Sequence, residues 1–409
     1  MKQVYFLLSA FLLLTSVSKA QDLINRGAIL FVRSGAVLYV GTNGLTNQTG
    51  STLTNAGTLR VDGPLTNASS STLNLSTGSA EIRGNFINAG NLEAGTSTVT
   101  FSGAANELLS AGGATLYRLI VNKPTIGANT LRLTGDLEIS NQIQLLNGQL
   151  NTQATSGVVY TLRLPVGATL SGEAPGRYVL GALQITRPAV SGSAVDFGHG
   201  AVLDPTTNNL GTVSITRVAG LQTADVSYGQ NFGNGSLIGI DRIWTVVPTI
   251  QPTAPVQLTL SWLPDNDNGI SALTQAQLWQ QAAVGQPWAA VGSAASVGLR
   301  SVTGSPTVLN RFTVNGTSSP LAVTQPIQNS SFGVYPTRVL KGQNVTYFYK
   351  GPVQAATLQV LDVVGRVIRT TVVDGRPLGD VSLADLASGI YLLRYSIATA
   401  SFSSRCVVE

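Results

Sequence analysis

The sequence predicts an all-β protein in three parts: a β-solenoid, a β-sandwich and a small Ig-like β-sandwich at the C-terminal end. Three observations predict this architecture. Short apolar triplets recur every 20 or 21 residues near the start, longer non-repeating strands follow, and the end of the chain alternates short strands with Gly turns. Only 11% of the 409 residues are charged, so neither a coiled coil nor charged disorder is expected.

Residues 1–20 have the pattern of a secretory signal peptide. Lys2 precedes an apolar run that ends at Leu14, and small residues lead up to Ala20, after which we expect cleavage. The run is too short to span a bilayer, and no later stretch reaches about 18 unbroken apolar residues. We therefore expect an exported protein without a transmembrane anchor.

Residues 21–152 carry the repeat. Three landmarks share one period, which composition alone rarely produces. They are Leu38 to Gly41 with Leu59 to Asp62 and Ala80 to Arg83, Leu45 to Asn47 with Leu65 to Asn67 and Phe86 to Asn88, and Ser51 to Leu53 with Ser71 to Leu73. This spacing is typical of one coil of a β-solenoid, with strands stacked about 4.8 Å apart. The expected inward stacks are Leu38 with Leu59, and Val40 with Val61 and Ile82.

The same register predicts contacts between polar side chains of successive coils. Arg60 should lie next to Glu81, and Asp62 next to Arg83, as opposite charges that stabilise the stack. The recurring Asn47, Asn67 and Asn88 should form a ladder of amide hydrogen bonds at a turn. These residues are therefore expected to have structural roles.

Residues 153–329 change to longer strands, which predict a β-sandwich. Val256 to Trp262 alternates apolar and polar residues strictly, and Asp241 to Val246 is also strand-like. Asp265 to Gly269 then interrupts the pattern, and a hairpin turn is expected there. Trp244 and Trp262 are in phase with the apolar faces of their strands and should be buried, whereas Trp288 should be exposed.

Residues 330–409 contain motifs that occur together in one known family. The stretch from 362 to 366 fits D-x-x-G-R, and the stretch from 386 to 391 fits L-x-x-G-[IV]-Y. An opening Tyr-Pro pair and a basic residue before a final apolar strand complete the pattern. The matching residues are Tyr335, Pro336, Asp362, Gly365, Arg366, Leu386, Gly389, Tyr391 and Arg405. On these residues the segment resembles the type A C-terminal sorting domain of the type IX secretion system. The family usually continues with Asn-Pro where this chain has Thr337 and Arg338.

The resemblance implies a small antiparallel sandwich that an outer-membrane export machine of Gram-negative bacteria recognises. It also implies passage through the periplasm, with a passenger that is secreted or held at the cell surface, in some cases on lipopolysaccharide after removal of the tail. In this tail we expect Gly365 and Gly389 to adopt positive φ. The side chains expected in its core are Leu383, Leu386, Ile390 and Leu392.

Most catalytic chemistry is excluded by composition. The chain has one Cys, one His and one Met, so disulfide frameworks and zinc clusters are not expected. His199 near Asp196 lacks a nucleophile motif, and Asp265 with Asp267 makes only half of a calcium loop, which leaves calcium binding there open. The segment between leader and tail has 14 basic and 14 acidic residues, which disfavours nucleic acid as a partner. We therefore expect no catalytic, cofactor or metal site.

The sequence thus favours an exported, non-enzymatic structural or adhesive protein with type IX secretion machinery, and extracellular glycans, as partners. Two alternatives stay open. One is a carbohydrate-active enzyme that uses the solenoid face, whose acids are Asp22, Asp62, Glu81, Glu93, Glu107, Asp136 and Glu138. The other is a glycan-binding module in the sandwich, with Trp244, Trp262, Trp279 or Trp288 as a stacking platform.

Overall fold

The computed structural model describes residues 22–124, 130–230, 238–270, 276–295, 300–316, 332–349, 355–373, 378–397 and 400–409. The predicted signal peptide and its cleavage site at Ala20 lie outside the described residues. The chain divides into two compact units, residues 1–318 and 319–409. Within the described ranges the only helical element is one 3-10 turn, η1 (Pro264–Asn266), so the all-β prediction is confirmed.

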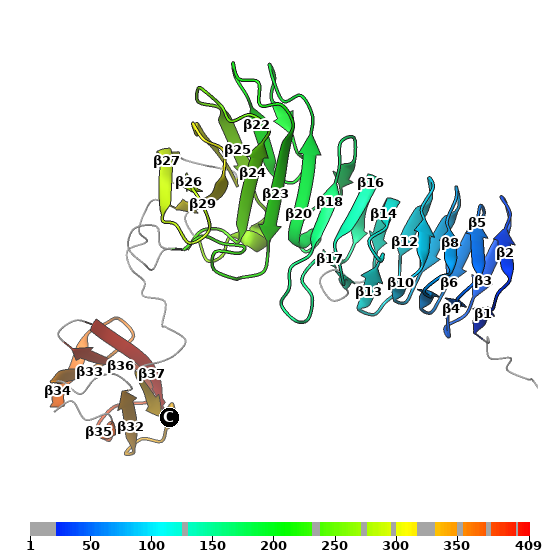
Figure 1. Cartoon of the computed structure of the whole chain (residues 1–409). Helices are drawn as coiled ribbons and strands as arrows, with labels where there is room; N and C mark the ends of the chain where they lie inside the picture. Colours follow the sequence, from blue (N-terminus) through cyan, green and yellow to red (C-terminus); the bar gives the residue numbers. More distant parts are fainter. Residues whose placement is uncertain are drawn as a thin grey trace, which may run out of the picture. The chain divides into compact units, whose positions relative to one another are not determined.

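The first unit begins with a parallel β-solenoid whose coils stack in succession along its axis (Figure 1). Its first face contains β1 (Leu23–Asn25), β4 (Leu45–Asn47), β7 (Leu65–Asn67), β10 (Phe86–Asn88), β13 (Glu107–Ser110), β15 (Thr130–Leu133) and β17 (Gln149–Asn151). Its second face contains β2 (Ile29–Val32), β5 (Thr52–Asn55), β8 (Thr72–Asn74) and β11 (Asn91–Glu93). Its third face contains β3 (Val37–Val40), β6 (Thr58–Val61), β9 (Ser79–Ile82), β12 (Thr98–Phe101), β14 (Thr115–Asn122), β16 (Leu137–Asn147), β18 (Thr161–Leu164), β19 (Thr169–Ser171) and β20 (Val179–Arg187).

The inward stacks have the register that the repeat predicts. Val40 pairs with Val61, and Val61 pairs with Ile82, on adjacent parallel strands. All three side chains are buried in one hydrophobic cluster that extends along the solenoid. The turns between faces are equally tight: a Cβ on Gly84 would lie 2.5 Å from the backbone of Gly63 in the previous coil. Only Gly fits such a close approach.

The predicted amide ladder is present and begins one coil earlier. Asn25, Asn47 and Asn67 each donate Nδ2 to the Oδ1 of the Asn in the next coil, ending at Asn88, over 2.7 to 2.9 Å. All four are buried, and each Nδ2 also donates to a backbone carbonyl. The ladder therefore satisfies the polar groups of the turn without water.

The predicted charge pairs are also present, as one group of four. Arg60 lies 4.0 Å from Glu81, and Arg83 lies 3.6 Å from Asp62, across neighbouring coils. The contacts within a coil are shorter, at 3.3 Å for Arg60 with Asp62 and 3.0 Å for Arg83 with Glu81. A hydrogen bond from Tyr39, together with the two guanidinium groups, lowers the pKa of Asp62.

Replacing Asn67 with Ala should lower the free energy of unfolding of the first unit by about 3 kcal/mol, since it removes a central rung and leaves buried partners unsatisfied. The same change at Asn74, whose amide bonds Glu93 on the exposed face, is the matched control and should cost well under about 1 kcal/mol. Denaturant titration measures both. Equal losses in the two variants would contradict a structural role for the ladder.

Parallel pairing continues beyond residue 152, to β20, which pairs with both β17 and β18. On its other side β20 pairs antiparallel with β23, so the solenoid sheet runs directly into the next part of the unit. That sheet continues with β23 (Val213–Ala219), β24 (Arg242–Pro248), β29 (Arg311–Gly316), β26 (Ala276–Gln281) and β27 (Trp288–Ala295). A second antiparallel sheet contains β21 (Val195–Asp196), β22 (Ala201–Asp204), β25 (Gln257–Ser261) and β28 (Ser301–Gly304). Both sheets contribute side chains to the cluster that fills the solenoid.

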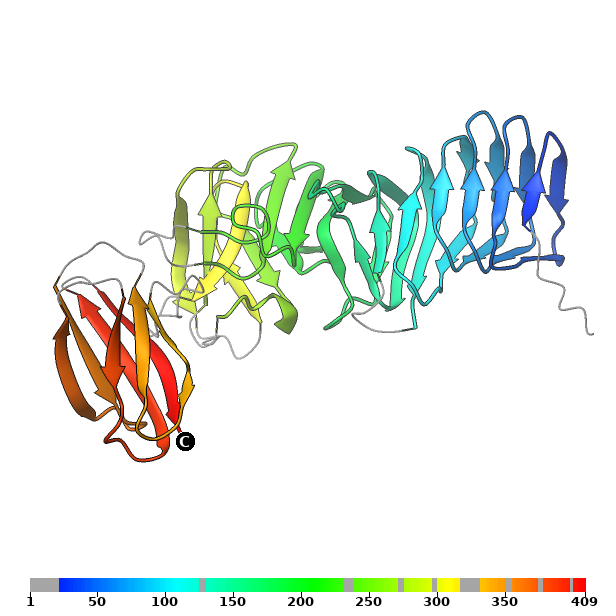
Figure 2. The ribbon, with the colours of Figure 1, turned by 90° about the horizontal axis from the view of Figure 1, so that it is seen from below.

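The second unit is a two-sheet structure with its own hydrophobic core (Figure 2). One sheet contains β30 (Phe332–Tyr335), β32 (Asn344–Tyr349) and β35 (Leu378–Ser382). The other contains β31 (Arg338–Val339), β37 (Ala400–Val408), β36 (Gly389–Ile397), β33 (Ala356–Leu361) and β34 (Val367–Val373). Stacked and tilted aromatic rings of Phe332, Tyr347, Tyr349 and Tyr395 fill the centre.

Candidate sorting-domain surface

The D-x-x-G-R motif forms the turn between β33 and β34. The Oδ1 of Asp362 accepts the backbone N–H groups of Val364 and Arg366, at 3.1 and 2.9 Å. Its Oδ2 lies 3.1 Å from the guanidinium of Arg366. Gly365 has φ of +82°, as expected, which a residue with a Cβ adopts only at a cost. The motif residues therefore build the turn itself.

The L-x-x-G-[IV]-Y motif leads into β36. Leu386 is buried, and Tyr391 is buried with its hydroxyl donating to the carbonyl of Ala387 over 2.8 Å. The expectation of positive φ at Gly389 is wrong, because this residue already has strand geometry as the first residue of β36. A Cβ there would meet the Tyr391 ring at 3.7 Å, an ordinary contact distance.

The predicted core of the tail is half correct. Leu383 and Leu386 are buried, but Ile390 and Leu392 are 44% and 37% exposed. Tyr391, Leu393 and Tyr395 face the core in their place. β36 has large apolar residues on both faces, so alternation does not specify which face is buried, and a shift of one residue reverses every side chain.

The opening motif places the chain beside the last strand. Tyr335 ends β30 with its side chain 75% exposed, and the Tyr335–Pro336 peptide bond is cis. Of the two residues where this chain departs from the family, Thr337 precedes β31 and Arg338 begins it; β31 pairs in parallel with β37, so that Arg338 lies opposite Val407. The carbonyl of Thr337 accepts the N–H of Val407 over 2.9 Å.

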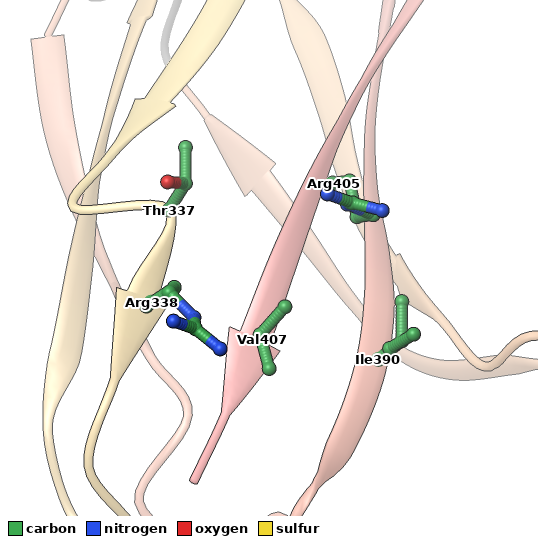
Figure 3. A pocket seen from close by; sticks show the side chains of 5 residues that line it. All are labelled: Thr337, Arg338, Ile390, Arg405 and Val407. Carbon is green, nitrogen blue, oxygen red and sulfur yellow. The ribbon is translucent and has the colours of Figure 1, made fainter.

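Arg405 lies in a shallow depression on the outer face of this sheet (Figure 3). The depression has a volume of about 670 Å³, and two guanidinium groups and two aliphatic side chains line it. Its lining residues are Thr337, Arg338, Ile390, Arg405 and Val407. Arg338 also contacts the Glu409 carboxylate at 2.9 Å, with 73% of its own side chain exposed. This basic and apolar surface suits a partner that offers carboxylates beside apolar groups.

Sequence reasoning predicted no such surface: it named Arg405 as part of the family pattern, Thr337 and Arg338 as a departure from that pattern, and Ile390 as a core residue. The alternation of Ile390, Leu392 and Arg394 along β36 was the available signal, since it places apolar and basic side chains on one face. Elsewhere in this unit Arg369 contacts Asp385, and this hydrogen bond lowers the pKa of the carboxylate. From residue 330 onward the chain has eight basic and five acidic residues, so the unit is basic as a whole.

The first unit contains a buried polar cluster, made of Glu173, Tyr178, His199, Arg217 and Arg242. Glu173 accepts two hydrogen bonds from the Arg217 guanidinium, at 2.6 and 2.8 Å. Arg242 donates Nε to Asn266 over 2.7 Å and lies 5.8 Å from the Tyr178 ring centroid. Burial lowers the pKa of Arg242 to about 9, with the charge of Arg217 acting in the same direction.

His199 is buried, and its Nε2 lies 3.1 Å from the carbonyl of Ile215. Burial, together with the charge of Arg217, lowers the pKa of His199 to about 3, so the ring is neutral at pH 7. Asp196 is exposed and accepts the backbone N–H of Gly198. His199 is therefore a buried residue hydrogen-bonded to the backbone, and Asp196 lies apart from it at the surface.

The expected hairpin at residues 265–269 is wrong, because β25 and β26 belong to different sheets and the segment connects them through η1. Asp267 accepts hydrogen bonds from Arg300, at 2.7 and 2.8 Å, and from Trp262 Nε1 at 2.9 Å. Asp265 accepts the N–H of Gly176 at 2.5 Å. Both carboxylates thus accept hydrogen bonds from groups of the protein. Within the described ranges no group of three His, Cys, Asp or Glu residues could hold a metal ion.

The Trp expectations are two-thirds correct. Trp244 and Trp262 are buried, as expected. Trp288 is also buried, at 5% exposure, so its predicted exposure is wrong. It packs with Ile243 and Trp279 and lies 5.8 Å from the Arg311 guanidinium. Trp288 therefore offers no exposed platform for stacking on a glycan, and of the four Trp residues only Trp279 is partly exposed.

Residues 333–409 match the family described as secretion system C-terminal sorting domain. This part of the chain is therefore a type IX secretion sorting domain, and the protein is type IX cargo, secreted or placed at the cell surface. No curated protein and no solved structure matches the chain. Among the described residues no helix has the length and apolar character needed to cross a bilayer.

Proposed function

We propose that the passenger, the unit that precedes the sorting domain, is a non-enzymatic structural or adhesive protein. The observation that carries the proposal is the polar outward face of the coils that follow the first one. Thr46 and Thr66 pair in register on one face, as do Thr52 and Thr72 on the next. Repeated hydroxyls and amides in register offer many weak and identical contacts, which suit multivalent binding to extracellular glycans or to lipopolysaccharide at the surface.

The carboxylates of the solenoid support a role without catalysis. An enzyme on this face would have seven acidic side chains available. Six of these seven accept a hydrogen bond or form an ion pair. They are Asp62, Glu81, Glu93, Glu107, Asp136 and Glu138. Glu107 is buried against Lys123, and burial raises its pKa. A glycosidase needs a pair of carboxyl groups with separate acid and base roles, and these side chains are engaged in the stack instead.

The test uses the purified chain with immobilised glycans and soluble polysaccharides. We expect retention on at least one glycan class without release of new reducing ends. Replacing Thr52, Thr54 and Thr72 with Ala should weaken retention by about 10-fold, because multivalent contacts are lost together. The matched control changes Thr259 and Thr303, an exposed hydroxyl pair of the sandwich, to Ala and should have no effect. Depolymerisation of any polysaccharide by the wild-type chain would contradict the proposal.

A further inference from the structure

The first coil of the solenoid differs from the coils that follow on its outward face. Ile29 and Phe31 of β2 are 82% and 55% exposed, and Val37 of β3 is 70% exposed. In the second coil the residues in register with these three are all threonines. The pairs are Ile29 with Thr52, Phe31 with Thr54, and Val37 with Thr58. Large apolar side chains thus stand at outward positions where the next coil has hydroxyls.

The strands of this coil also have an unpaired edge among the described residues. β1, β2 and β3 each pair on one side only, with β4, β5 and β6. Exposed edges of soluble proteins usually carry charged residues, Pro or bulges that prevent pairing with another chain. The sequences of these strands, LIN, ILFV and VLYV, contain none of these residues. Both the backbone and the outward side chains of this coil are therefore suited to a partner.

The segment that the sequence predicts to remain before β1 is too short to cover this edge. Cleavage after Ala20, which the sequence predicts, would leave only Gln21 and Asp22 before β1. Two extended residues reach about 7 Å, too short to pair with three strands. The far end of the solenoid is already paired, since β20 continues into β23. Among the described residues of the first unit, the solenoid therefore has one open end.

We propose that two copies of the protein join through their first coils, end to end. A twofold axis perpendicular to the solenoid axis would set each strand of one first coil antiparallel to a strand of the other. All three edges would then gain backbone hydrogen bonds together, which a single extended peptide cannot achieve. Ile29, Phe31 and Val37 of one copy would become cross-strand neighbours of apolar residues in the other. Because the contact is isologous, it closes at a dimer.

The charged residues at this end are compatible with the contact. Arg26 and Arg33 lie exposed in the turns that join the strands, and Asp22 precedes β1. The strand edges carry no charge, so none is buried by pairing. The opposite sign of Asp22 offsets the two arginines in part, and the rim of the contact would hold both signs of charge, as interface rims generally do.

The test is the mass of the full chain in solution, by sedimentation velocity over a concentration series. The wild-type chain is expected to reach dimer mass at micromolar concentration. The variant I29T/F31T/V37T has the residues that the second coil carries at the same positions, so it should fold normally. The dissociation constant of its dimer should be at least about 100-fold higher than that of the wild-type dimer. The control V247T/I250T removes two exposed apolar side chains of the sandwich and should behave as wild type.

Spin labels identify the contact. In a Cys406→Ser background, a label at Ser34→Cys, in the turn after β2, should report a short distance between copies, and a label at Ser193→Cys should report a long one. A wild-type chain that stays monomeric would overturn the proposal. The same holds if the chain is monomeric and its intact mass shows that residues before Gln21 remain and cover the edge. Unchanged dimerisation of the threonine variant, or growth into larger polymers, would overturn it equally.

Discussion

Replacing Glu173 with Ala is expected to lower the free energy of unfolding of the first unit by about 3 to 5 kcal/mol. Glu173 lies between β19 and β20, and both its oxygens contact Arg217, whose side chain is fully buried. The substitution would leave a buried guanidinium without its countercharge, in a cluster that also holds Arg242. Removing one partner of a buried ion pair lowers the free energy of unfolding strongly, because the other charge stays buried and unpaired. Replacing both partners with apolar residues changes this free energy far less.

The matched control is Asp136→Ala, which removes an exposed hydrogen bond from the Thr161 N–H and an ion pair with Arg163 at 2.6 Å whose side chains are 46% and 42% exposed. Exposed pairs contribute at most about 1 kcal/mol, so this loss should be small. Denaturant titration of both variants measures the difference. A Glu173 variant within about 1 kcal/mol of wild type would contradict the account of the cluster.

The same residue predicts a pH dependence. Burial alone would raise the pKa of Glu173, but the charge and hydrogen bonds of Arg217 lower it to about 2. Because the folded pKa lies below the unfolded value of about 4.3, this carboxylate stabilises the fold fully above that value. Its contribution is lost as the pH falls toward about 2. The variant Glu173→Gln should therefore show a weaker fall in stability than wild type across this window.

The solenoid could be predicted in detail because its sequence repeats. The period alone places Val40, Val61 and Ile82 in one stack and Asn47 beside Asn67. A parallel coil sets register by repeat length alone, so a local count of residues determines which side chains meet across coils. Asn25 was missed although Leu23 to Asn25 fits the triplet of the later coils, because it precedes Asn47 by 22 residues, whereas the other intervals are 20 or 21.

The tail and the sandwich show where such reasoning stops. β36 reads Gly-Ile-Tyr-Leu-Leu-Arg-Tyr, with large apolar residues on both faces, so only the packing of Tyr391 and Tyr395 identifies the buried side. The buried Arg217 and Arg242 sit in strands that look half exposed in sequence. Their partners are distant along the chain, as Glu173 is 44 residues from Arg217, and no local pattern shows such a pairing.

The central claim is that the tail directs the whole chain to the cell exterior. The two units have separate hydrophobic cores, so removing residues 330–409 should leave the first unit folded. The most direct test fractionates cells that produce the chain with and without these residues, each with its leader. We expect the complete chain outside the outer membrane, and the truncated chain intact, protease-resistant and confined to the periplasm. A truncated chain that reaches the surface or the medium as efficiently as the complete one would contradict the account.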